Sequence, residues 1–238
     1  MVEEKRFQQW LNFLSGATHP LVWNPWRDYD ERYDLSKTSP VQRLSQLESY
    51  LRPRLGKAKY VVIAEAMGYQ GGHFSGIAMT CERMLLGHHP AVSPEDIIPN
   101  SWFGQSDQLR TSNPNSPYIE QRTQRELGFN EPTDTVVWSA IKENGLDPQN
   151  VLLWNIFPFH PYHENRLLSN RTPSDEELIW GWQFTEELLS MHGDALIFAV
   201  GKKSQQILEQ FGKVAIGLRH PANGGATAYK EGFRNALK

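Results

Sequence analysis

The chain has 238 residues, of which 39% are hydrophobic and 21% charged, and no apolar run approaches the roughly 18 residues that a membrane-spanning helix needs. A formal net charge of −3 argues against a protein that coats nucleic acid non-specifically, because such binding comes from Lys and Arg neutralising phosphates. The lone cysteine, Cys81, excludes an internal disulfide, a four-cysteine zinc site and a cysteine-ligated iron-sulfur cluster.

Short apolar runs alternate with helical patterns along the chain. The apolar runs predict buried parallel strands at 60–64, 151–155, 195–200 and 213–218. The helical patterns lie at 41–55, 133–143, 202–211 and 227–237. Another helix is expected to run to Met191 from Thr172, which would be its N-cap, with Pro173 and Asp175 in the first turn.

This order of elements predicts a single α/β domain over 1–238. We expect a three-layer α/β/α sandwich around a four-stranded parallel sheet, with an N-terminal helical extension at about 1–57 and a long polar insertion or lid at about 99–130. Ligands of such sheets bind beyond the carboxyl ends of the strands, so the loops that follow the predicted strands are the ones to inspect.

The first of these loops is rich in glycine, with Gly68, Gly71, Gly72 and Gly76 directly after a strand. Glycine lets the backbone approach a ligand closely, but the spacing does not fit a dinucleotide fingerprint, and a plain strand-to-helix turn is the alternative. Phe74 in this loop is placed either to stack on a planar ligand or to anchor the loop in the core.

The loop after the second predicted strand begins at Asn155. An amide at the end of an apolar strand is costly without partners, and it can donate and accept on one face, as reading a pyrimidine edge requires. The alternative is a capping asparagine. His160 and His163 follow, but Pro161 breaks helical spacing and no third ligand is evident, so we expect no metal.

The loop from Arg219 to Gly225 follows the last predicted strand and contains His220. A histidine at this edge can donate to negative charge that develops on a leaving base, although a lone histidine is more often structural. Its convergence with Asn155 and the glycine loop at one sheet edge favours the functional interpretation.

Together the three loops resemble the uracil-DNA glycosylase superfamily, over roughly residues 58–235. Ala64-Glu65-Ala66-Met67-Gly68 is similar to the family's first motif, and His220-Pro221-Ala222 to its third. Phe74 corresponds to the stacking residue and Asn155 to the amide that reads the base. The resemblance implies a four-stranded parallel sheet between helices, and a pocket in which uracil is cut from DNA.

The resemblance also implies roles for individual residues. Asn155 would pair with the uracil edge, Phe74 stack on it, His220 donate to a uracil oxygen, and backbone amides near Glu65 and Ala66 complete the anion pocket. Further base-binding candidates are Gly68, Tyr69 and Gln70. The expected DNA-contacting loop consists of Arg219, Pro221, Ala222, Asn223 and Gly224.

Two departures distinguish this chain within the family. Ala66 stands where the best-known members place a catalytic Asp or Asn, and the cysteines of the iron-sulfur members are absent, which predicts a divergent, cluster-free branch. Glu65 is therefore the first candidate to position water, with Gln70 and His73 behind it; bracing the loop is an equal alternative for Glu65. Ala222 and Asn223 replace the large apolar wedge of many relatives.

The expected function is hydrolysis of the N-glycosidic bond of uracil, or of another deaminated base, in base excision repair. We expect no cofactor, a monomeric cytoplasmic protein without membrane contact, and DNA as the partner, single-stranded or mismatched DNA being preferred because base flipping costs less there. The alternatives are a slow or inactive protein that binds uracil-containing DNA, and a hydrolase or binder of free nucleosides or nucleotides.

Overall fold

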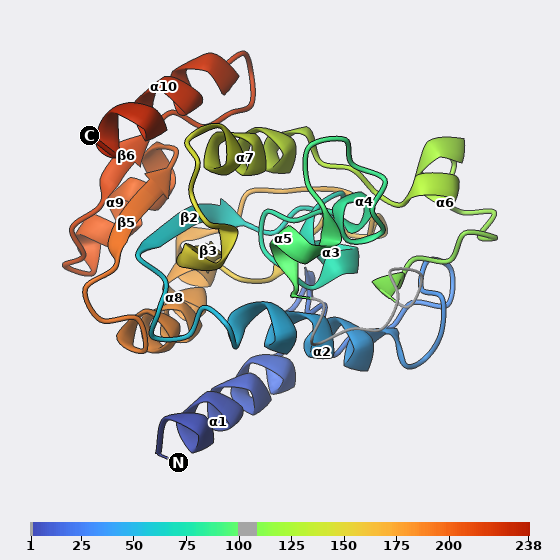
Figure 1. The fold of residues 1–238 in the computed structure, drawn as a ribbon. Coiled ribbons are helices and arrows are strands. Elements are labelled where there is room, and N and C mark those ends of the chain that lie inside the picture. Colours follow the sequence, from blue (N-terminus) through green and yellow to red (C-terminus); the bar gives the residue numbers. More distant parts are fainter. Residues whose placement is uncertain (1, 100–108) are drawn as a thin grey trace.

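The computed structural model describes residues 2–99 and 109–238, so part of the predicted 99–130 insertion lies outside the described residues. Its main sheet has four parallel strands in the order β3-β2-β5-β6 (Figure 1). They are β2 (Tyr60–Ala66), β3 (Val151–Phe157), β5 (Leu196–Val200) and β6 (Ile216–Leu218). The predicted fold class is confirmed.

The longer helices cover both faces of this sheet, as helices do when they connect parallel strands. α7 (Pro132–Glu143) contacts α10 (Ala226–Ala236) on one face, and α8 (Asp175–Ser190) packs on β3 on the other (Figure 1). α9 (Lys202–Gln210) connects β5 to β6. α1 (Val2–Gly16) packs against α8 and against α2 (Ser39–Leu51).

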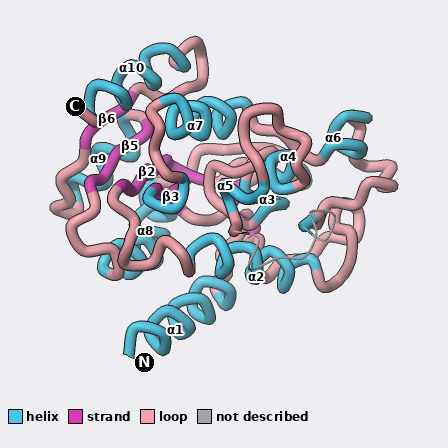
Figure 2. The backbone as a smooth tube through the Cα atoms, in the orientation of Figure 1, coloured by secondary structure: helices cyan, strands magenta, loops and turns pink. Residues whose placement is uncertain are grey.

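Short elements fill the connections (Figure 2). Between β2 and α7 lie α3 (Gly72–Ser75), α4 (Glu82–Leu85), α5 (Pro94–Ile97) and α6 (Arg122–Leu127). A 3-10 turn, Pro148–Asn150, leads into β3. β1 (Val22–Trp23) and β4 (His160–Pro161) form a separate antiparallel pair, so the N-terminal segment joins the loop after β3.

Four element boundaries that bear on the site differ from the prediction. β2 and β3 continue to Ala66 and Phe157, so Glu65, Ala66 and Asn155 lie within strands rather than in loops. The last strand begins at Ile216, because the Lys213 N–H donates to Leu208 at the end of α9 and Val214 is 91% exposed. The N-cap of α8 is Ser174, not Thr172; Ser174 and Glu177 form a capping box.

The adjacent strands β2 and β5 lead to opposite faces of the sheet. The chain after β2 runs to α7, whereas the chain after β5 runs to α9, which packs with β5, β2 and β6. Their connecting loops diverge and leave a crevice beyond the carboxyl ends of the two strands, which is where open α/β sheets bind ligands.

The candidate active-site pocket

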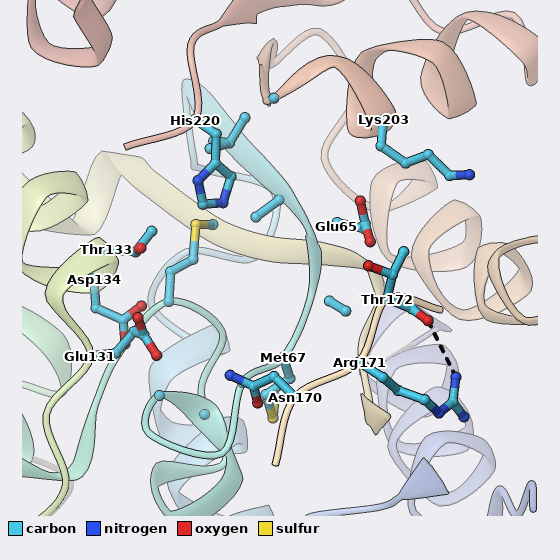
Figure 3. Close-up of a pocket in the computed structure, with 18 of the residues that line it drawn as sticks. Glu65, Met67, Glu131, Thr133, Asp134, Asn170, Arg171, Thr172, Lys203 and His220 are labelled. Carbon is cyan, nitrogen blue, oxygen red and sulfur yellow. Dashed lines mark hydrogen bonds between the residues drawn. The ribbon is translucent and has the colours of Figure 1, made fainter. Parts of the chain in front are cut away.

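A pocket of about 490 Å³ lies at this divergence (Figure 3). Its volume is in the usual range for small-molecule sites. The lining comes from the ends of β2 and β5, the start of α7 and the segment before α8: Ala64, Glu65, Ala66, Met67, Gly68, Gly71, Gly72, Met79, Glu131, Thr133, Asp134, Asn170, Arg171, Thr172, Val200, Gly201, Lys202, Lys203 and His220.

Four of the residues expected from the sequence line this pocket, namely Glu65, Ala66, Gly68 and His220. Glu65 is half-buried near the end of β2, and Figure 3 shows it on the same side as Lys203. Burial raises the pKa of the Glu65 carboxyl, whereas the positive charge of Lys203 opposes that rise. Among the described residues, no side chain forms a hydrogen bond with the Glu65 carboxylate, and Glu65 is part of the pocket lining.

The hydrogen bonding of His220 fixes its tautomer. The backbone N–H of Ala222 donates to Nδ1 of His220 at 3.1 Å. Nδ1 therefore accepts, and a neutral imidazole must carry its proton on Nε2. Burial, helped by the charge of Arg219, lowers the pKa of His220 and so favours this neutral form. The ring is a preset N–H donor at the pocket wall.

Asn155 lies beside the pocket on the neighbouring strand, where it pairs in register with Ala64 of the lining. It is 1% exposed, and within the described part of the chain neither Oδ1 nor Nδ2 of its amide has a hydrogen-bond partner. Leaving a buried donor or acceptor unpaired costs about 1–3 kcal/mol. An unpaired amide here suits a ligand that presents a complementary donor and acceptor.

Phe74 does not line the pocket. Its ring is fully buried and stacks on Phe129 at a centroid distance of 4.3 Å, in a separate small cluster with Ile119. This corresponds to the core-anchor alternative. Met79 lines the pocket instead, with a backbone φ of 48° and a carbonyl that accepts from Trp138 Nε1. A thioether offers a soft apolar surface for a planar ring.

The glycine loop is held by partners far away in sequence. The Tyr69 N–H donates to Asn170 Oδ1 at 2.9 Å, and Nδ1 of His73 and Nδ1 of His160 are 2.8 Å apart. Trp23 of β1 stacks on the His73 ring at 4.9 Å. Tyr69 is therefore a loop brace through its backbone, and neither its side chain nor Gln70 is part of the lining.

His160 and His73 form a fully buried neutral pair. His160 Nε2 lies 2.7 Å from the Ser169 carbonyl and must donate to it, so its Nδ1 accepts from His73. Burial lowers the pKa of His160 to about 4 and that of His73 well below its usual value. Among the described residues, no cluster of three or more His, Cys, Asp or Glu side chains is arranged to hold a metal ion.

The predicted DNA-contacting loop forms a tight exposed turn between β6 and α10. Ala222, Asn223 and Gly224 are exposed, and the last two have positive φ angles of 54° and 75°. Pro221 is buried and Arg219 is exposed. Of the loop, only His220 lines the pocket, so the other residues form its rim or lie outside it.

Sequence reasoning missed several lining residues. Apart from Met79, they are Glu131, Thr133, Asp134, Asn170, Arg171, Thr172, Lys202 and Lys203. Most precede or begin a helix, where polar residues are ordinary caps, so composition gave no reason to single them out. Their place in the fold could have indicated them, because the starts of α7 and α9 lie beyond the same edge of the sheet.

The described helices include none with the length and apolar character to cross a membrane. No curated protein matches this chain. A solved structure, wild-type Pedobacter heparinus SMUG2, shares the fold with a TM-score of 0.58 and 15% sequence identity, over 98% of this chain and 96% of that one. The family model of the uracil DNA glycosylase superfamily matches residues 113–237, more than half of the sequence, and the chain belongs to that superfamily.

Proposed function

We propose that this protein is a DNA glycosylase that hydrolyses the N-glycosidic bond of uracil, or of another deaminated base, in DNA. The main support is the buried amide of Asn155, which lies beside the pocket and has no hydrogen-bond partner among the described residues. The wall of the same pocket holds the Nε2–H donor of His220. One group is suited to recognise a base edge, and the other to stabilise negative charge on that base as it leaves.

The proposed mechanism divides the two developing charges between the walls of the pocket. His220 Nε2–H donates to the departing base, and the Asn155 amide reads its edge. The base lies against Met79 instead of Phe74, because Phe74 is buried against Phe129. The carboxylate of Glu65 favours the positive charge that forms on the sugar and positions the attacking water.

The exposed turn at Ala222 and Asn223 contacts the DNA backbone but carries no bulky wedge, so single-stranded or mismatched sites are preferred. Lys202 and Lys203, at the start of α9, supply positive charge at the pocket for the flanking phosphates.

The test is incubation with a labelled oligonucleotide that carries one uracil, followed by alkali, which cleaves at abasic sites. We expect cleavage at the uracil position in the single-stranded form, with slower release from a U:A duplex. Binding in a shift assay without abasic sites would instead indicate an inactive uracil-DNA binding protein.

A hydrolase of free nucleosides is the second candidate. The net charge of −3 and three carboxyl groups in the pocket lining, those of Glu65, Glu131 and Asp134, favour a neutral ligand over a phosphorylated one. Competition separates the two functions: excess deoxyuridine inhibits release from the oligonucleotide, and is itself hydrolysed, only if the free nucleoside is the substrate.

A further inference from the structure

Two carboxyl groups lie on the pocket wall opposite Glu65. Glu131 is the N-cap of α7 and Asp134 is the third residue of that helix, so their side chains share one face of its first turn. Figure 3 shows both on one side of the pocket and Glu65 on the other. The family motifs identified in the sequence include neither residue.

The Asp134 carboxyl lacks the partners that a structural carboxylate normally has. The residue is 3% exposed, and its Oδ2 has no hydrogen-bond partner among the described residues. Across the described ranges, neither Asp134 nor Glu131 forms an ion pair with Lys, Arg or His. Burying a polar group without a partner is costly, and such sites are often functional.

The glycine loop passes directly over this pair. A Cβ at Gly71 would lie 2.9 Å from Asp134 Oδ2, and a Cβ at Gly68 would lie 3.5 Å from Glu131 Oε2. Glycine at position 71 therefore lets the loop approach the Asp134 carboxyl closely, whereas the distance at Gly68 is an ordinary van der Waals contact. The same loop lines the pocket, so the pair belongs to the wall against which a ligand rests.

The electrostatics of the pair favour one shared proton. Burial, and then the negative charge of Glu131, raise the pKa of the Asp134 carboxyl well above its usual value. Burial also raises the pKa of Glu131, although the Thr133 backbone N–H bonds its carboxylate and opposes the rise. Two adjacent carboxyls resist double ionisation, so the deeper Asp134 holds the proton and Glu131, at the helix N-terminus, carries the charge.

We propose that Asp134 is a proton donor to the bound base, a role that rests on the glycosylase function proposed above. Its neutral carboxyl donates a hydrogen bond to an acceptor atom of the base, a carbonyl oxygen or a ring nitrogen. When the bond between the sugar C1′ and the base nitrogen breaks, its electron pair leaves with the base, and the Asp134 proton moves onto the base.

Water adds its oxygen to C1′ and gives a proton to the Glu65 carboxylate. The Glu65 proton then passes to solvent, and solvent returns one to Asp134. Glu131 takes no proton in this sequence; its negative charge favours the protonated form of Asp134, which makes Glu131 a positioning residue.

The first experiment compares Asp134→Asn with the parent protein on two oligonucleotides, one carrying uracil and one carrying 5-fluorouracil. Fluorine stabilises the anion of the departing base, so the release of 5-fluorouracil depends less on an acid. Asparagine can donate a hydrogen bond but cannot transfer a proton. We expect about a 100-fold loss on uracil, a typical size for acid catalysis, and a clearly smaller loss on 5-fluorouracil.

The second experiment measures the pH profile of Glu131→Gln. Removing its charge lowers the pKa of Asp134, so the alkaline limb of the uracil profile moves to lower pH, whereas the limb disappears in Asp134→Asn. Asp194→Asn, an exposed aspartate just before β5 at the opposite edge of the sheet, is the matched control and keeps the parental rate and profile. Thermal melting verifies that each variant is folded.

The outcomes separate the two proposals. An unchanged rate in Asp134→Asn, or the same loss on both bases, overturns the proton-donor role while leaving the glycosylase function intact. Absence of base release by the parent protein overturns both. If Asp134→Asn fails to fold, Glu131→Gln decides alone, and an unshifted alkaline limb contradicts the inference.

Discussion

At the scale of single residues, the pocket is defined by side chains whose hydrogen-bonding capacity the protein itself leaves unused. His220 presents Nε2–H because Ala222 occupies Nδ1, and Asn155 has neither amide atom paired within the described residues. Such groups destabilise the fold, and binding sites are where that cost is retained. Position and pairing thus support the proposed roles more strongly than residue type alone.

Replacing His220 by alanine removes the donor to the departing base. We expect base release to slow by at least about tenfold, which corresponds to ~1.4 kcal/mol in the activation barrier. Single-turnover measurement of abasic-site formation gives this rate directly. A parental rate would identify His220 as a structural residue.

Replacing Asn155 by leucine, which has a similar shape, separates function from stability. Base release should be lost, while the free energy of unfolding rises by about 1 kcal/mol because no buried donor or acceptor is left unpaired. Chemical denaturation and the uracil assay measure the two effects. Loss of stability would mean that the amide has a structural partner, and would contradict the base-reading role.

The residue scale is also where the sequence was least informative. Asn155 and His220 could be singled out because each is polar at the end of an apolar run. The sequence could not tell whether Phe74 or Met79 lines the pocket, because both follow the same strand and only packing decides which side chain points into it. Asp134 carried no signal, since an acid in the first turn of a helix is an ordinary stabilising feature.

At the scale of elements, the glycine loop is positioned by contacts with β1, β4 and α7 rather than by its own sequence. Trp26 Nε1 donates to the Gly76 carbonyl at 3.0 Å, and Asn24 Nδ2 donates to the Leu14 carbonyl at 2.8 Å near the end of α1. The N-terminal segment thereby supports the pocket loop. Such long-range contacts leave no periodic pattern in a sequence, unlike the four buried strands.

Gly71→Ala tests the close approach between this loop and α7. The added Cβ would meet Asp134 Oδ2 at 2.9 Å and displace either the loop or the carboxyl, so base release should fall by about tenfold or more. Gly16→Ala is the matched control, because its Cβ would meet nothing within 4 Å. Equal rates in the two variants would show that the loop does not need this approach.

The His73–His160 pair predicts how stability depends on pH. Both side chains are neutral in the folded protein, and the pKa of His160 is about 4 there, against about 6.5 when unfolded. The unfolded chain therefore binds protons first, and stability falls as the pH drops from about 6.5 towards 4. At pH 5 the loss from His160 alone is about 2 kcal/mol.

Thermal melting at pH 7.5 and pH 5 measures this dependence. Replacing both His73 and His160 by phenylalanine should make it shallower, whereas asparagine at the exposed His163 should not. An unchanged slope in the double variant would assign the acid sensitivity to other groups.

At the scale of the whole molecule, parallel-sheet topology determines where the site lies. The diverging connections of β2 and β5 create the crevice, and the buried, β-branched strands that dictate this sheet were visible in the sequence. The lengths of the strands and the start of α8 were less predictable, because a few local hydrogen bonds decide them, including those of the Ser174–Glu177 capping box. The family's fold therefore follows from the sequence more directly than the lining of its pocket.

The net charge and the exposed turn predict the preferred form of DNA. With a charge of −3 and no wedge at Ala222, the protein should release uracil faster from single strands and mismatches than from U:A duplexes. Release should also slow steeply between 50 and 200 mM salt. Over this range the affinity for DNA falls about 10³-fold or more in proteins that make many phosphate contacts. Equal rates on duplex and single strands would contradict this preference.

We expect the pocket to excise a base that the Asn155 amide recognises. The most direct measurement is mass-spectrometric detection of free uracil released from a single-stranded oligonucleotide, comparing the parent protein with Asn155→Asp. An aspartate accepts but cannot donate to the base, so we predict uracil release by the parent and at least about tenfold less by the variant. Equal release by the two proteins would exclude Asn155 from base recognition, and no release by the parent would exclude uracil excision.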